Sequence, residues 1–280
     1  MSRPILLIAA ASALCVMVAS CQKPQETAQV PPAQAADPAP ATKAPAADKP
    51  VLMVFAGSAT QRATEQLCAE FGQRENLTVR DTYGGSGEVL RQFALEQTGD
   101  VYIPGSDDFM DKAKKEGRIL AETAKTLCYL MPAIAVEKGN PKGIKEVKDL
   151  AKPGLKVALA DPKAVCLGIV AEEVLRTEGI TDAVKKNVVT NTGSCAQTRT
   201  VVETGEVDAA IGWDVFAAES PTKIEVIALP KKLQKFRTVP AAVIKYSKQR
   251  ELAQKLIDFL SGAEGRAAYK QAGFTVEVKP

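Results

Sequence analysis

The stretch Phe55-Ala56-Gly57-Ser58-Ala59-Thr60 decides the predicted fold. Residues 51–55 form an apolar run that is typical of a buried strand. A polar–apolar helical pattern follows, and Ser58 lies where the N-cap of that helix is expected. A strand that enters a helix through a Gly-Ser turn leaves free backbone N–H groups at the positive end of the helix. We therefore expect an anion-binding turn here.

The same strand–turn–helix design occurs again along the chain. A single turn of this kind is ordinary helix capping in most α/β proteins, but the recurrence favours a cleft in which helix ends hold an anion. The further turns, each followed by a predicted helix, are Tyr83-Gly84-Gly85-Ser86-Gly87-Glu88 before residues 89–97, Asp161-Pro162 before residues 165–176, and Thr192-Gly193-Ser194-Cys195 before residues 196–204.

Strand-like and helix-like segments alternate from residue 51 onward, which indicates an α/β fold with mostly parallel, doubly wound sheets. Long extended runs, the first over residues 127–137, separate this pattern into blocks. We predict two lobes joined by two crossing strands: residues 50–130 with 239–280, and residues 131–238. Ligands of open α/β sheets lie beyond the carboxyl ends of the strands, so the facing lobes would form a cleft that closes by hinge motion.

The N-terminal residues carry export signals. Residues 1–20 have a positive start at Arg3 and an apolar stretch too short to span a membrane comfortably, as in a signal peptide. Val18-Ala19-Ser20-Cys21 looks like a bacterial lipobox, which predicts cleavage before Cys21 and its lipidation. The alternative is a soluble signal peptide with an incidental cysteine. Residues 21–49 are rich in Pro, Ala and Gln and predict a disordered tether. The protein is expected to be exported, periplasmic and anchored to a bacterial membrane.

Composition excludes several function classes. The formal charge of +3 is too small to indicate nucleic-acid binding, and the 280-residue chain contains no histidine. A zinc hydrolase and a Ser-His triad are therefore excluded. No Cys, Asp or Lys arrangement supplies a nucleophile with a base at recognisable spacing. We expect a binding protein without a cofactor rather than an enzyme.

Several motifs together resemble the periplasmic molybdate/tungstate-binding proteins of ABC importers, over essentially residues 51–276. The resemblance implies a periplasmic-binding-protein fold, a monomer, capture of a small inorganic oxyanion, and delivery to an ABC permease in the inner membrane. It rests on Val54-Phe55-Ala56-Gly57-Ser58, Gly85-Ser86, Val136-Glu137-Lys138-Gly139-Asn140-Pro141, Ala160-Asp161-Pro162, residues 202–211 (VETGEVDAAI) and Gly273-Phe274.

The resemblance also implies a ligand site. That family holds its oxyanion with uncharged donors, and its serines at helix starts match Ser58 and Ser86. Its backbone contacts from the other lobe match Leu167, or the neighbouring Cys166, and Cys195. A tyrosine hydroxyl completes the family's site, but Trp213 stands at that position here. Tryptophan keeps one donor but is larger and cannot accept a hydrogen bond.

The cysteines leave three interpretations open. Cys166 with Cys195 is the natural pair for a structural disulfide, since disulfides are common outside the cytoplasm. Alternatively, the cysteines are buried free thiols, as expected for Cys68 on its helix. In the third interpretation, Cys128, Cys166 and Cys195 form a thiolate cluster for a thiophilic ion such as arsenite, antimonite or Cu(I), for uptake or sensing.

Overall fold

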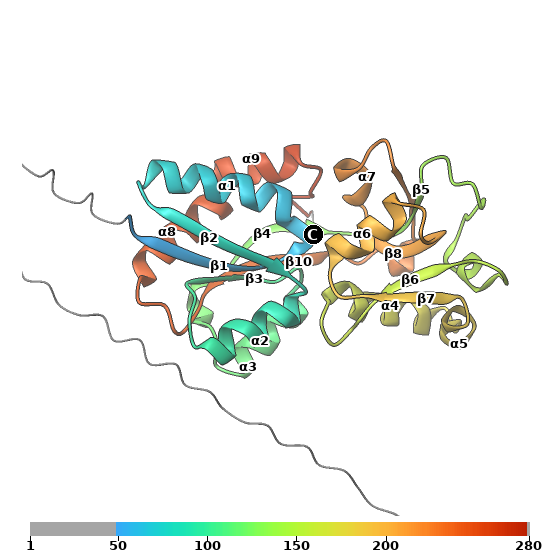
Figure 1. Cartoon of the computed structure of the whole chain (residues 1–280), viewed down its shortest axis with the longest axis horizontal. Coiled ribbons are helices and arrows are strands. Elements are labelled where there is room, and N and C mark those ends of the chain that lie inside the picture. Colours follow the sequence, from blue (N-terminus) through green and yellow to red (C-terminus); the bar gives the residue numbers. More distant parts are fainter. Residues whose placement is uncertain (1–48, 279–280) are drawn as a thin grey trace, which may run out of the picture. The chain divides into compact units, whose positions relative to one another are not determined.

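The first sheet of the protein has five strands, in a computed structural model that describes residues 49–278. Their order is β2-β1-β3-β10-β4. Figure 1 labels these strands. β10 is antiparallel to both its neighbours, whereas β1 is parallel to β2 and β3. The bounds are β1 Val51–Gly57, β2 Thr78–Gly84, β3 Val101–Ile103, β4 Lys125–Leu130 and β10 Arg237–Val243.

The second sheet has the same plan, with the order β7-β6-β8-β5-β9. β6 is parallel to β7 and β8, and β5 is antiparallel to β8 and β9. β5 and β10 are the strands by which the chain enters a sheet from the other one. They therefore start at the edge where the parallel strands end, which explains their reversed direction. The bounds are β5 Pro132–Glu137, β6 Val157–Ala160, β7 Val188–Thr192, β8 Ala209–Trp213 and β9 Ile224–Ala228.

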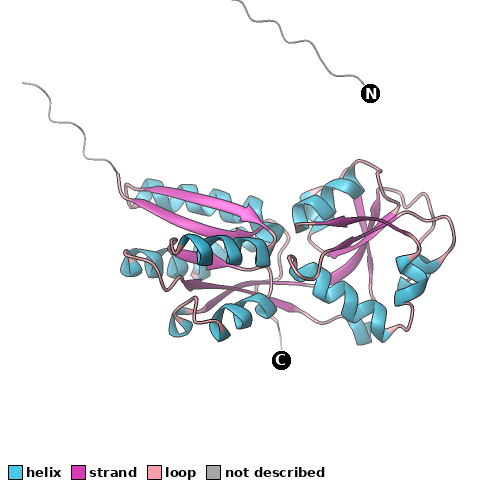
Figure 2. Ribbon diagram, turned by 60° about the horizontal axis from the view of Figure 1, so that its bottom comes forward, coloured by secondary structure: helices cyan, strands magenta, loops and turns pink. Residues whose placement is uncertain are grey.

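Helices cover both faces of the sheets, so each sheet is the middle layer of a sandwich (Figure 2). With the first sheet lie α1 Gln61–Arg74, α2 Ser86–Glu96, α3 Asp107–Lys115, α8 Arg250–Ser261 and α9 Ala263–Gln271. With the second lie α4 Cys166–Thr177, α5 Thr181–Lys185, α6 Cys195–Glu203 and α7 Phe216–Glu219. Short 3₁₀ helices are η1 Ser58–Thr60, η2 Ala121–Thr123, η3 Val147–Ala151 and η4 Lys231–Leu233.

The two-lobed α/β fold expected from the sequence is thus present. We refer to the part of the chain built on the first sheet as lobe one and the part built on the second as lobe two. The chain passes from one to the other at Met131 and returns between β9 and β10. The run 127–137, expected as a single extended segment, is two strands in different sheets. Asp214 fixes this first crossing, because it accepts a hydrogen bond from Met131 N at 3.2 Å.

An aromatic cluster in lobe one supports the start of α2. The rings of Phe93 and Tyr102 lie 5.1 Å apart between their centroids, and Phe55 packs against Phe93 at 5.7 Å. The buried Tyr102 hydroxyl donates to the main-chain oxygen of Ser86 at 2.9 Å. A buried phenol needs such a partner, so the core side chain also fixes the position of Ser86.

Some sequence predictions concern residues outside the described range, and one needs correction. The signal peptide, the lipidation at Cys21 and the tether lie in the part of the chain that is not described, apart from residue 49. Within residues 49–278, no helix combines the length and the apolar character that a membrane crossing requires. The helix after the Gly-Gly-Ser turn begins at Ser86 rather than at residue 89, because the glycine turn is shorter than expected.

Candidate functional site

Four helix starts carry the residues that the sequence singled out. Ser58, Ser86, Cys166 and Cys195 are the first residues of η1, α2, α4 and α6 respectively. Each helix follows a strand, β1, β2, β6 or β7, whose carboxyl end lies at the same edge of its sheet. The first turn of each helix presents N–H groups that have no partner within the helix, and a short side chain with an oxygen or sulfur atom.

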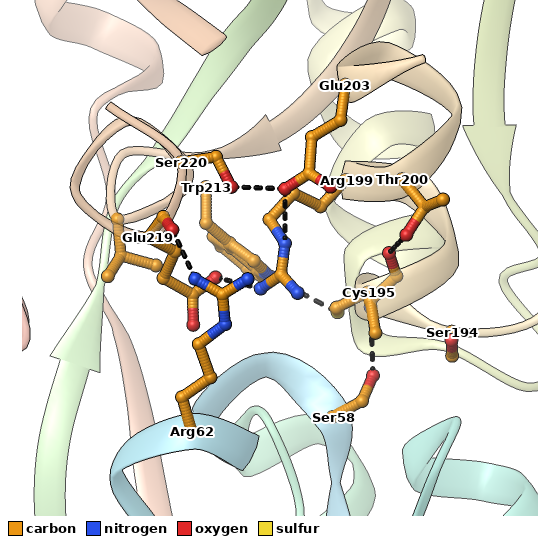
Figure 3. Close-up of polar contacts among 12 residues, drawn as sticks. Ser58, Arg62, Ser194, Cys195, Arg199, Thr200, Glu203, Trp213, Glu219 and Ser220 are labelled. Atoms are coloured by element: carbon orange, nitrogen blue, oxygen red, sulfur yellow. Dashed lines mark hydrogen bonds and ion pairs between the residues drawn. The ribbon is translucent and has the colours of Figure 1, made fainter. Parts of the chain in front are cut away.

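Ser58 joins the two lobes. Its Oγ accepts a hydrogen bond from Ala196 N, in the first turn of α6, at 3.0 Å (Figure 3). The predicted N-cap role of Ser58 is wrong, because β1 continues to Gly57 and the 3₁₀ turn Ser58–Thr60 comes before α1. Ser58 is buried, and its own hydroxyl hydrogen stays free to donate because its oxygen is the acceptor of this bond.

Ser86, the second serine from lobe one, is also buried. Its Oγ accepts from Gly105 N at 3.0 Å. A side chain at Gly105 would place its Cβ 2.8 Å from the Cys166 sulfur and 3.6 Å from the Ser86 oxygen. The absence of a side chain at Gly105 therefore allows the lobe-two sulfur to approach the lobe-one serine.

Backbone contacts close the lobes around these side chains. Gly87 N, in α2, donates to the main-chain oxygen of Ala164 at 2.8 Å. A Cβ at Gly85 would lie 2.5 Å from the main-chain oxygen of Gly193 and 2.7 Å from that of Ala164. Only glycine permits this approach, so the Gly85-Ser86 turn fits between both lobe-two loops.

The two lobe-two cysteines lie side by side as free thiols. The Cys195 thiol, the Ser86 hydroxyl and Leu167 N–H donate to the Cys166 sulfur, which lowers the pKa of Cys166 although burial opposes the shift. The pKa of Cys195 is raised, first by its hydrogen bond to Cys166 and then by burial. The fully buried Trp213 donates its indole N–H to the Cys195 sulfur at 3.3 Å.

The structure therefore brings Ser58, Ser86, Leu167, Cys195 and Trp213 to one place, together with Cys166. Cys128 does not join them, which corrects the predicted cluster of three cysteines. It lies on β4, where it pairs with Val239 of β10 in the first sheet, and burial raises the pKa of its thiol. Among the described residues, no group of three or more His, Cys, Asp or Glu side chains is arranged to hold a metal ion.

A charged network that the sequence did not predict lies beside these residues. Arg62 on α1 donates to the main-chain oxygen of Glu219, and Arg199 on α6 pairs with the Glu219 carboxylate (Figure 3). Arg199 also lies 3.0 Å from Glu203, which accepts from the Ser220 hydroxyl. Burial raises the pKa of Glu219, and Arg199 opposes this shift. Spacing is the signal that could have found the arginines, since each follows Ser58 or Cys195 by four residues and so lies one helical turn away.

The donors at the site suit the binding of an anion. Hydroxyl, thiol and backbone N–H donors come together from four helix starts, and the indole donor comes from the end of β8. The charged groups beside them are paired with one another. Such a set of donors can surround an anion whose oxygens lie in several directions.

Comparison with known proteins shows the family to which the chain belongs. The family described as bacterial extracellular solute-binding protein matches residues 52–275. The molybdate-binding protein ModA of Mycobacterium tuberculosis strain H37Rv is 27% identical, covering 80% of this chain and 84% of that protein. A putative ABC transporter substrate-binding lipoprotein of Bacillus subtilis, YvgL, is 26% identical over 82% of this chain and 88% of its own.

A solved structure has the same fold. The periplasmic molybdate-binding protein of Azotobacter vinelandii superposes with a TM-score of 0.69 at 18% identity, covering 82% of this chain and 99% of its own. The resemblance to the molybdate-binding proteins of ABC importers, predicted from the sequence, is confirmed by these matches.

Proposed function

Because this chain belongs to the bacterial extracellular solute-binding proteins of ABC importers, we propose that its solute is a small oxyanion of the molybdate or tungstate class. The observation that carries the proposal is the meeting of Ser58, Ser86, Cys195 and Trp213 between two lobes. Each is an uncharged donor held by its own helix or strand.

The donor set suits a tetrahedral dianion. Ser58 accepts a backbone N–H through its oxygen, so its hydroxyl hydrogen is left to donate to a ligand. The Ser86 hydroxyl, which also accepts a backbone N–H, would turn its hydrogen from the Cys166 sulfur to the ligand. The ends of four helices add partial positive charge without a titrating group. A buried anion surrounded by donors keeps its charge, because hydrogen bonds replace the water that it loses on binding.

The wider assignment follows from the same proposal. The protein would act as a monomer without a cofactor or catalytic step, carried on a lipid at Cys21 and delivering its anion to an ABC permease in the inner membrane. The name of the Bacillus subtilis relative supports the lipid anchor. An assay for turnover with the purified protein and the anions tested below checks that bound ligand is released unchanged.

A thermal-shift panel tests the proposal. Molybdate, tungstate, sulfate, phosphate, arsenite and Cu(I) would each be added with and without reductant. A ligand at one hundred times its dissociation constant stabilises the folded state by about 2.7 kcal/mol. For a folded part of this size the midpoint should rise by roughly 5–10 °C. We expect that rise with molybdate or tungstate, with or without reductant. No rise with molybdate, tungstate, sulfate or phosphate would reject the proposal.

A second candidate ligand is a thiophilic ion, and the contact between Cys166 and Cys195 favours it. Two adjacent thiols can condense with one arsenite, forming two As–S bonds and releasing water, because thiolates select soft centres. In the same panel this ligand would stabilise only the reduced protein. Replacement of Cys195 by serine would then abolish binding while the protein still folds, whereas an unchanged affinity for arsenite rejects the candidate.

Arg62 should control how long the closed state lasts. Its guanidinium, in lobe one, donates to the Glu219 main-chain oxygen in lobe two. Replacement by alanine is expected to speed release of bound molybdate by about 2- to 10-fold, since an exposed hydrogen bond contributes about 0.5–1.5 kcal/mol. Stopped-flow displacement measures the rate. Arg74→Ala is the matched control on the same helix, because its partners Glu70 and Glu264 both lie in lobe one. Equal release rates in the two variants would contradict the role of Arg62.

A further inference from the structure

We propose that Cys166 and Cys195 are a reversible dithiol–disulfide pair, and that their oxidation weakens ligand capture. The pair is carried by one lobe and stands at the surface that the other lobe must meet. The inference rests on the proposed function only where ligand affinity is measured, because formation of the disulfide is detected without any ligand.

The framework that holds the two sulfurs is local to lobe two. Cys166 and Cys195 begin α4 and α6, which follow the adjacent parallel strands β6 and β7. The ends of these strands are joined, since Ala160 pairs with Thr192 and Asp161 N donates to the Thr192 oxygen at 2.9 Å. Two thiols held by neighbouring strand ends remain neighbours when the lobes separate, so a bond between them does not require lobe closure.

The two thiols are unequal in the way that disulfide formation requires. A hydrogen bond from Cys195 is the main cause that lowers the pKa of Cys166. Cys195 and Leu167 N–H both belong to lobe two and remain next to Cys166 when the lobes open, so Cys166 is the thiolate that attacks. With a small-molecule disulfide as oxidant, Cys166 bonds to one of its sulfurs and releases the other as a thiol. Cys195 then attacks Cys166 in the mixed disulfide and releases the second thiol. Two protein thiols and one disulfide thus give one protein disulfide and two small thiols.

Access to the pair depends on the lobes. In this closed arrangement Cys166 is fully buried and Cys195 is 3% exposed. Cys166 lies against Gly105 and Ser86 of lobe one. Ala196, the residue after Cys195, donates a hydrogen bond to Ser58. When the lobes open, these lobe-one residues no longer shield the two thiols. A bound ligand that holds the lobes closed should therefore protect both thiols from oxidation.

Oxidation alters contacts that the closed state uses. A covalent S–S bond is much shorter than a hydrogen-bonded contact between thiols, so at least one sulfur must move. If the Cys166 sulfur moves, it leaves Ser86 of lobe one. If the Cys195 sulfur moves, it leaves the indole N–H of Trp213. The Cys195 thiol hydrogen, one of the donors at the site, is also lost.

The test uses the full-length protein and oxidised glutathione. After incubation, remaining thiols are alkylated with iodoacetamide and peptides are mapped by mass. We expect a linked peptide containing Cys166 and Cys195, formed at least about 10-fold more slowly when molybdate is saturating. Molybdate affinity should fall at least about 10-fold in the oxidised protein and recover after reduction. Small-angle X-ray scattering should show a larger radius of gyration for the oxidised protein, a readout that needs no ligand.

Matched variants separate the pair from the other cysteines. Cys128→Ala changes a buried thiol of lobe one and should keep the linked peptide. Cys195→Ala should lose it and leave glutathione on Cys166. The inference is overturned if the wild-type protein forms no linked peptide, or if the linked protein keeps both its affinity and its radius. If the reduced protein binds no oxyanion, the proposed function is rejected. The radius of gyration of the oxidised protein then tests the dithiol–disulfide pair without a ligand.

Discussion

Replacement of Gly85 by alanine should lower molybdate affinity by about 100-fold while the protein still folds. The added Cβ would lie 2.5 Å from the Gly193 oxygen and 2.7 Å from the Ala164 oxygen. Both atoms belong to the backbone of lobe two, so neither can move as a flexible side chain would. Overpacking of this kind costs about 1–3 kcal/mol, and about 2.7 kcal/mol corresponds to 100-fold in affinity. Calorimetric titration measures the affinity.

The control for this variant is Gly193→Ala, which adds the same methyl group across the contact. Its Cβ would meet only the terminal oxygen of Gln197, at 3.6 Å. Affinity should change little in that variant, and the melting temperature of both variants without ligand should match that of the unaltered protein. If Gly85→Ala binds as tightly as Gly193→Ala does, the closed arrangement is not the one that holds the ligand.

Replacement of Ser86 by alanine should weaken molybdate binding by about 5- to 150-fold. The change removes a hydroxyl donor from a buried anion and leaves Gly105 N, which donates to Ser86 at 3.0 Å, without its acceptor. The loss of a partner from a buried polar group costs about 1–3 kcal/mol, which sets the expected range. The same titration measures the effect, and the release rate should rise as well.

Ser261→Ala is the matched control for a lost serine hydroxyl. Ser261 donates to the Ile257 oxygen at 2.8 Å, on α8 and away from the helix starts of the site. It should lower stability slightly and leave affinity unchanged. Equal affinities of the Ser86 and Ser261 variants would remove Ser86 from the set of ligand donors.

The sequence predicts those strands and helix starts that are determined by residues close to them in the chain. Val51–Gly57 is buried at five of its seven residues and is followed by small residues, so the pattern predicts its strand and the following helix start. Cys195 begins its helix one residue before the predicted start because Ser194 is the N-cap, with its oxygen accepting from Gln197 N at 3.1 Å. Short polar turns of this kind act within a few residues, and periodicity therefore places them closely.

The contacts between the lobes depend on tertiary structure. Gly105 matters because its empty side-chain position admits the sulfur of Cys166, which is far away in the sequence. Arg62 meets Glu219 only after both lobes have folded. The cysteine cluster expected from the sequence includes Cys128, but the pairing of β4 with β10 keeps Cys128 in lobe one. Residue type and spacing do not encode such distances.

Intrinsic fluorescence tests the central claim most directly, because Trp213 is the one tryptophan of the chain. It is fully buried at the site, and its indole N–H donates to Cys195. Titration of the reduced protein with molybdate should give a saturable change at one anion per protein, and Gly85→Ala should shift the curve to about 100-fold higher concentration. A folded protein whose emission stays constant with molybdate, tungstate, sulfate and phosphate would contradict an oxyanion site between the lobes.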